Sequence, residues 1–247
     1  MHPQTTGAPP RSPATRGSPS ELSAPGTAPL RRGADLGCGG SRDPSALNHA
    51  MPSATALIDG NNFYASCEQS LDPALIGRPV VVLSNNDGCI VARSAEARAL
   101  GIAMGTPYFK ARTELARQNV VVRSSNYALY ADMSQRMMSL LETHCEELEI
   151  YSIDEAFARL SRPRSGDLQH WARRLRARVR QDLGLPIAIG VGASKGQAKL
   201  ANRLAKQVPA HAGVFDLGRC DDADNWLETV AIEDVWGIGR KLARWCR

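Results

Sequence analysis

Three carboxylates stand at positions from which they could act together in catalysis. Asp59 ends the apolar run TALID, and the neighbours Asp154 and Glu155 lie between two further apolar runs. A carboxylate at the end of a buried strand is costly unless a cation meets it. Mg²⁺ prefers oxygen ligands and bridges to substrate phosphates, so this set could hold two ions for in-line displacement at phosphorus. The pattern predicts a metal site, with a solvated hairpin turn as the simpler alternative.

Asp154 and Glu155 can share such a site only if the backbone turns near them. Successive side chains of a regular strand point to opposite faces of the sheet. We therefore expect a turn or a bulge at Asp154-Glu155, between the strands predicted over 148–153 and 156–160.

Basic residues in two predicted helices could bind phosphate. Lys195, Lys199 and Arg203 are spaced at i, i+4 and i+8, on one face of a helix that opens after a Gly-Ala-Ser turn. A basic helix that begins there offers cations and free N–H groups to an anion. Arg98 lies in a short helix predicted over 95–100 and could also face an anion. An exposed basic surface is the alternative for both.

Two further motifs are weaker. Phe63 and Tyr64 follow Asp59 by four and five residues, so the tyrosine could pack on a ribose or fill the core. Gly237-x-Gly239, followed by Arg240-Lys241, fits the turn of a helix-hairpin-helix, which can present backbone N–H groups to a DNA phosphate. The five arginines between positions 173 and 180 are more typical of a solvated helix face.

The elements that must position these residues alternate between strand-like and helix-like segments after Met51. Strands are predicted over 55–59, 79–83, 89–92 and 186–191, and long helices over 126–145, 168–183 and 195–206. Apolar residues at helical spacing mark the long helices. Strands mixed with helices in this order predict an α+β (α/β-mixed) sheet domain.

Composition separates the first 50 residues from the rest of the 247-residue chain. Residues 1–50 contain eight prolines and seven glycines and no aromatic residue, which predicts a disordered N-terminal extension. The net charge of +5 permits an anionic partner such as nucleic acid. No apolar run of about 18 residues occurs, so we expect no membrane association. Six scattered cysteines without a CxxC pair favour a reducing, cytoplasmic setting.

Taken together, six motifs in order resemble the Y-family translesion DNA polymerases, and within them the UmuC branch, the catalytic subunit of DNA polymerase V. The matching strings are IDGNNFYASCE (Ile58–Glu68), RPVVVLSNNDGCIVARSAEARALGI (Arg78–Ile102), SSNYALYADMS (Ser124–Ser134), EIYSIDEAF (Glu149–Phe157), GVGASKGQAKLANRLAK (Gly190–Lys206) and DVWGIGRK (Asp234–Lys241). The similarity extends from about Ala54 to Arg247.

The resemblance implies a UmuC-like catalytic core over 51–217. Its ferredoxin-like palm sheet would comprise 51–62 and 127–217, with a small inserted fingers domain over 63–126. Residues 218–247 would begin a helical thumb that contains the helix-hairpin-helix loop. Because the chain ends at Arg247, we expect a truncated thumb and no little finger.

The resemblance also assigns roles to individual residues. Asp59, Asp154 and Glu155 would be catalytic metal ligands for two Mg²⁺ ions, with the Gly60 carbonyl as a further ligand. Tyr64 would be the steric gate against a ribose 2′-OH, with Phe63 beside it, and Arg98 and Lys199 would hold the triphosphate. The DNA-binding loop would use Gly237, Gly239, Arg240 and Lys241.

The function implied is error-prone translesion DNA synthesis in DNA repair and SOS mutagenesis, as a DNA-directed DNA polymerase. Its partners would be dNTP and damaged primer–template DNA, with a UmuD-type subunit and a recombinase filament as further ones. Two alternatives stay open: a truncated remnant that binds nucleotide or a partner without extending DNA, and a nucleotidyl cyclase on a similar palm. The DVWGIGRK segment and the tyrosine gate argue against the cyclase.

Overall fold

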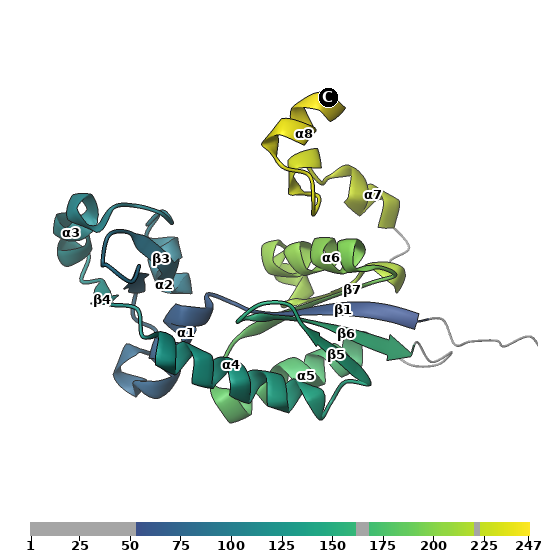
Figure 1. Cartoon of the computed structure of the whole chain (residues 1–247), viewed down its shortest axis with the longest axis horizontal. Coiled ribbons are helices and arrows are strands. Elements are labelled where there is room, and N and C mark those ends of the chain that lie inside the picture. The colour runs from purple at the N-terminus through teal and green to yellow at the C-terminus, as the bar shows by residue number, and fades with distance from the viewer. Residues whose placement is uncertain (1–52, 162–167, 220–222) are drawn as a thin grey trace, which may run out of the picture. The chain divides into compact units, whose positions relative to one another are not determined.

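The structure, a computed structural model, describes residues 53–161, 168–219 and 223–247 (Figure 1). The predicted disorder of residues 1–50 therefore falls outside the described residues. Among the helices within those ranges, none is both long enough and apolar enough to cross a membrane.

A five-stranded sheet forms the larger part of the fold, in the order β5-β6-β1-β7-β8. Its strands are β1 (Ser53–Gly60), β5 (Glu147–Ile150), β6 (Glu155–Ser161), β7 (Ile187–Gly192) and β8 (Val214–Asp216). The central strand β1 runs antiparallel to both of its neighbours, and β8 pairs in parallel with β7. Because β1 is paired on both edges, the residue at its end is held at the middle of the sheet.

The two faces of this sheet differ in chemistry. Leu57 pairs with Phe157, and Asp59 with Glu155, across the β1–β6 ladder, so all four side chains share one face. Helix α6 (Lys195–Gln207) covers that face, and α4 (Tyr127–Glu142) and α5 (Leu168–Leu183) cover the opposite one (Figure 1). The alternation of the strands thus places both carboxylates under α6.

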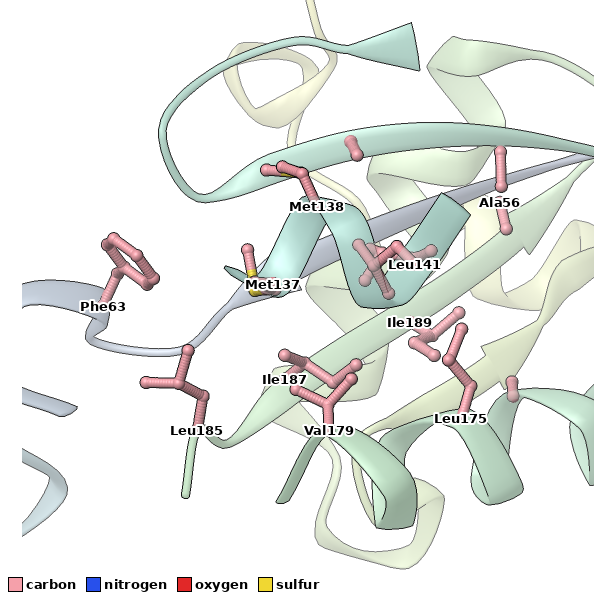
Figure 2. Close-up of a cluster of buried hydrophobic side chains, with 14 of the residues drawn as sticks. Ala56, Phe63, Met137, Met138, Leu141, Leu175, Val179, Leu185, Ile187 and Ile189 are labelled. Carbon is pink, nitrogen blue, oxygen red and sulfur yellow. The ribbon is translucent and has the colours of Figure 1, made fainter. Parts of the chain in front are cut away.

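The face under α4 and α5 carries the main hydrophobic core. Met137 and Leu141 of α4, spaced at i and i+4, meet Leu175 of α5 and Ile187 and Ile189 of β7, and all five are almost fully buried (Figure 2). Burying an aliphatic side chain of this size contributes roughly 1.5–3 kcal/mol. This core therefore provides a rigid support for the polar face of the same sheet.

Helix α6 lies unusually close to the sheet because two glycines of β7 face it. A Cβ atom at Gly190 would lie 2.0 Å from the backbone nitrogen of Asn202, and one at Gly192 would lie 2.6 Å from the Cβ of Gln197. The buried Asn202 amide donates hydrogen bonds to the carbonyls of Leu57 (3.3 Å) and Ala188 (2.9 Å). These contacts fix the helix over β1 and β7.

A second, three-stranded sheet has the order β3-β2-β4. It consists of β2 (Val80–Leu83), β3 (Ile90–Arg93) and β4 (Val121–Arg123), with α2 (Ala95–Ala99) and α3 (Tyr108–Arg117) beside it and α1 (Phe63–Leu71) before it in the chain. Val81, Leu83, Ile90 and Leu115 form its own small core. The predicted fold class, a larger sheet with a small inserted domain, is confirmed.

The C-terminal segment contains α7 (Ala223–Glu228) and α8 (Arg240–Cys246). Gly237 between them has a φ of +89°, which favours glycine, and Gly239 is the N-cap of α8. The segment contacts α6 through an ion pair between Asp234 and Arg203, at 2.5 Å. The boundaries proposed for palm, fingers and thumb stay predictions.

The close approach at Gly190 leads to a stability prediction. Gly190→Ala should lower the free energy of unfolding by at least about 2 kcal/mol, because its methyl group would meet backbone atoms of α6 rather than a movable side chain. The measurement is urea denaturation of the full chain. Gly196→Ala is the matched control, since its nearest new neighbour lies at 3.9 Å, and it should stay within about 1 kcal/mol of wild type. Equal stabilities of the two variants would contradict this account.

Candidate active site

Asp59 and Glu155 form the centre of the candidate site. They face each other across the β1–β6 ladder, and Asp59 is 9% exposed. Lys206 of α6 places its Nζ atom 2.6 Å from Asp59 Oδ2, and Lys199 places its Nζ 3.0 Å from Glu155 Oε2. Each carboxylate on this face is therefore met by one lysine from the helix above it.

The turn before Glu155 brings in the third carboxylate. The hydroxyl of Ser152 accepts a hydrogen bond from the Glu155 backbone N–H (3.1 Å) and donates one to Asp154 Oδ1 (2.8 Å). The Gly60 N–H donates to the Asp154 carbonyl at 2.8 Å, which ties the turn to β1. The turn that the side-chain alternation requires thus occupies residues 151–154. The strand predicted over 148–153 was too long, because these hydrogen bonds end it at Ile150.

Six of the eight residues predicted to bind metal or nucleotide line one cavity of about 450 Å³, and the other two, Glu155 and Lys199, do not. Its lining includes Asp59, Gly60, Phe63, Tyr64, Arg98 and Asp154, together with Lys206. Arg93 of β3 also lines it. Two carboxylates, three cations and two aromatic rings from β1, β3, α1, α2, α6 and the 151–154 turn therefore converge on one space. Such a space suits a ligand that is both anionic and aromatic.

Tyr64 is held in place by other rings. It stacks on Tyr130 with ring centroids 4.2 Å apart and meets Tyr127 edge-on at 6.1 Å. The Tyr130 hydroxyl donates to Glu68 at 2.8 Å, which fixes the supporting ring. Burial, with smaller effects of Tyr127 and Asp154, raises the pKa of the Tyr64 phenol, so it stays neutral. The ring acts as a rigid wall rather than as a base.

Lys206 is the residue that the sequence analysis missed. From Lys199, positions i+4 and i+7 lie about 40° and −20° away around a helix, so Lys206 shares the face of Lys199 more closely than Arg203 does. Lys206 lines the cavity with Arg98, whereas Lys199 is held beside it by Glu155. The i, i+7 spacing from Lys199 was the sequence signal that indicates Lys206.

Lys199 lies in an aromatic setting next to the cavity. Its Nζ lies 4.6 Å from the ring of Tyr151, 5.8 Å from that of Phe157 and 5.5 Å from that of Trp236. These rings hold its ammonium group against Glu155 through cation–π contacts. Lys199 and the cavity cation Lys206 thus occupy distinct positions on α6.

The predicted DNA-binding residues lie away from this cavity in the C-terminal segment. Gly237 and Gly239 are exposed, Arg240 begins α8, and Lys241 is an exposed residue of its first turn. Trp236, just before them, packs against Phe157 and Tyr151, with ring centroids 6.1 Å and 6.0 Å apart. The loop is therefore attached to the same sheet face as the carboxylates.

The electrostatics of Asp59 reflect a buried, incompletely compensated carboxylate. Burial raises its pKa to about 6, the neighbouring Glu155 adds to the rise, and Lys206 opposes it. A cation that entered between Asp59 and Glu155 would lower this pKa. Its charge would offset both the desolvation of the buried carboxylate and the repulsion from Glu155. The site is thus arranged to favour the arrival of positive charge.

The donor set fits a hard divalent cation in its chemistry. Within the described ranges, no three acidic, histidine or cysteine side chains stand close enough together to hold an ion. Asp59 and Glu155 are paired with lysines, and Asp154 with Ser152. Oxygen donors are nevertheless the ligands that Mg²⁺ prefers, and the raised pKa of Asp59 marks a shortage of positive charge.

Comparison with known proteins identifies the family. Residues 58–203 match the model of the impB/mucB/samB family. The chain belongs to this family. It is 50% identical to Protein UmuC of Salmonella typhimurium over 191 residues, which cover 76% of this chain and 45% of that protein. The resemblance to the UmuC branch is therefore confirmed.

Two further relatives support the same assignment. DNA polymerase IV of Corynebacterium diphtheriae is 35% identical over 186 residues, or 74% of this chain and 40% of that protein. The solved structure of a Y-family DNA polymerase chimera of Dbh and Dpo4 has a TM-score of 0.66 and 26% identity, covering 77% of this chain and 56% of the other. The family member described here spans less than half the length of these curated relatives.

The raised pKa of Asp59 predicts how stability depends on pH. Since the folded pKa lies above the unfolded value of 3.8, protonated Asp59 contributes its full stabilisation below about pH 4 and loses it as the pH rises to about 6. The contribution of Asp59 to the free energy of unfolding should therefore fall by an amount on the order of 3 kcal/mol over this pH range, at 1.36 kcal/mol per pKa unit.

The measurement is chemical denaturation in metal-free buffer between pH 4 and 7, as the difference between wild type and Asp59→Asn. That difference should change across this interval. Lys206→Gln should move the change to higher pH, because it removes the cation that lowers the pKa. A difference that does not vary with pH would disprove the assignment.

Proposed function

We propose that this chain carries the nucleotidyl-transfer centre of an error-prone DNA polymerase that copies damaged templates. The observation that carries the proposal is the convergence of Asp59 and Asp154 with Arg98 and Lys206 on one cavity, with Glu155 paired to Asp59. Family membership supports a polymerase rather than a cyclase.

The reaction would join the primer 3′ oxygen to the α-phosphorus of a dNTP. The bond from that phosphorus to its bridging oxygen breaks, and diphosphate leaves. Arg98 and Lys206 line the cavity as cations that can hold the phosphates and stabilise charge on their oxygens. Lys199, paired with Glu155, is the further cation on α6.

Two Mg²⁺ ions bound by Asp59, Asp154, Glu155 and the Gly60 carbonyl would supply activation of the 3′-OH and neutralisation of the leaving diphosphate. The chain's own contribution is the placement of these donors. Pairing across β1–β6 fixes Asp59 and Glu155, and the hydrogen bond from Gly60 to the Asp154 carbonyl fixes the third donor.

Sugar selection would depend on Tyr64. Its ring lines the cavity beside Phe63 and is braced by Tyr130, so it cannot withdraw without disturbing the stack. A rigid ring at this position would exclude a ribose 2′-OH from a nucleotide whose sugar lay against it.

The finer biological setting is also a proposal. We place the reaction in SOS mutagenesis, with damaged primer–template DNA as substrate and a UmuD-type subunit and a recombinase filament as partners, on the family relationship alone. Gly237, Gly239, Arg240 and Lys241 would contact the DNA backbone without reading its sequence.

The first test is single-nucleotide primer extension with Mg²⁺ at low salt, on undamaged and abasic templates. Asp154→Ala should lower the extension rate at least about a hundredfold, because it removes a carboxylate that would hold Mg²⁺ at the reacting phosphate. Asp132→Ala is the control, since Asp132 is an exposed residue of α4 that pairs only with Arg136 within the described structure. Wild type that binds dNTP but never extends a primer would favour the non-catalytic remnant.

A second prediction concerns the sugar. Tyr64→Ala should raise the ratio of ribonucleotide to deoxyribonucleotide incorporation at least about tenfold. The substitution removes only the volume that excludes the 2′-OH and no hydrogen bond to the nucleotide. Tyr64→Phe retains the stacked ring and should keep the wild-type ratio. Equal ratios for wild type and Tyr64→Ala in competition assays would rule out the gate.

A further inference from the structure

The basic face of α5 is divided between two sides of the helix. Arg173, Arg176 and Arg180, spaced at i, i+3 and i+7, line one cavity of about 610 Å³ together with Glu96 of α2. Arg174 and Arg178 line a different one, on the other side of the helix. The arginine helix is therefore more than the solvated surface that its sequence suggests.

The arginine-lined cavity is connected to the candidate active site by shared residues. A third cavity of about 350 Å³ is lined by Arg176 and also by Arg98 and Lys206. Arg98 and Lys206 line the catalytic cavity too. A continuous series of cationic side chains thus leads from Asp59 to the face of α5.

The α5 arginines of this series are available to a ligand, whereas Lys206 is paired with Asp59. Arg176 donates to the Ile187 carbonyl (2.9 Å) and Arg180 to the Gly184 carbonyl (2.6 Å), which orients both guanidinium groups. In the described part of the chain, no carboxylate lies within ion-pairing distance of Arg173, Arg176 or Arg180. The acid that lines this cavity, Glu96, accepts a hydrogen bond from Gln69 at 3.4 Å.

We propose that this groove, lined by Arg173, Arg176 and Arg180, binds the leaving diphosphate and forms its exit route. The inference rests on the proposed function, which releases diphosphate beside Arg98 and Lys206. Guanidinium groups match phosphate oxygens in geometry and charge. The diphosphate could therefore bind the arginines of the series one after another as it leaves. Under the proposed function the sugar of the incoming nucleotide would lie by Tyr64, so nucleotide binding would not involve the α5 arginines.

The test measures equilibrium binding of inorganic pyrophosphate and, separately, of a dNTP to the full chain by calorimetry at low ionic strength. Arg173→Gln/Arg180→Gln should weaken pyrophosphate binding about two- to fivefold for each arginine removed, with dNTP affinity within twofold of wild type. Arg174→Gln is the matched control, because it is the exposed neighbour of Arg173 on the other side of α5, and it should change neither. Arg173→Gln alone serves if the double variant folds poorly.

Three outcomes are informative. Pyrophosphate affinity that is the same in wild type and Arg173→Gln/Arg180→Gln, in a chain that binds dNTP, would overturn the exit groove and leave the proposed function standing. Parallel loss of both affinities would also overturn it, since the groove would then be part of the nucleotide site. Absence of dNTP binding in wild type would instead count against the proposed function.

Discussion

The approach of α6 to the sheet is the constraint on which the rest of the structure depends. Gly190 and Gly192 present no side chains to the helix, so the backbone of α6 lies very close to β7 at these two positions. At this depth, Lys206 contacts Asp59 and Lys199 contacts Glu155. The glycines therefore set the electrostatics of the site although neither contributes a functional group.

This arrangement keeps stability and chemistry on opposite faces of one sheet. The face toward α4 and α5 is packed with aliphatic side chains, whereas the face toward α6 carries a buried carboxylate with a raised pKa. A buried charge opposes folding, and the hydrophobic core beneath it offsets that cost. Because β1 is paired on both edges and contributes to both faces, the strand that holds Asp59 is fixed by pairing and packing together.

Much of this could be predicted from sequence, and the failures have physical causes. The mixed α/β class follows from the alternation of strand-like and helix-like segments, and the turn near Asp154 follows from side-chain alternation along a strand. The carboxylate set was proposed from the cost of burying charge and from the family resemblance, and its role in metal binding stays a prediction. Sequence spacing could not show where the turn begins, because that depends on hydrogen bonds made by Ser152. Lys206 was missed because the i, i+4, i+8 spacing moves progressively around a helix. Residues at i and i+7 stay on nearly the same face. The helical spacing of the α5 arginines separates them onto two sides of the helix, but the cavities that those sides line depend on tertiary packing.

The pairing of each carboxylate with a lysine suggests how one site can serve both a stable protein and a reactive one. Without a ligand, Lys206 and Lys199 compensate Asp59 and Glu155, which limits the cost of burying them. A nucleotide and its cations would bring both signs of charge. The carboxylates could then pair with metal ions instead of lysines, and a lysine could pair with phosphate instead of a carboxylate. The net charge buried would change little during that exchange. Under the proposed function, the lysines of α6 would be partners that the carboxylates give up when substrate binds.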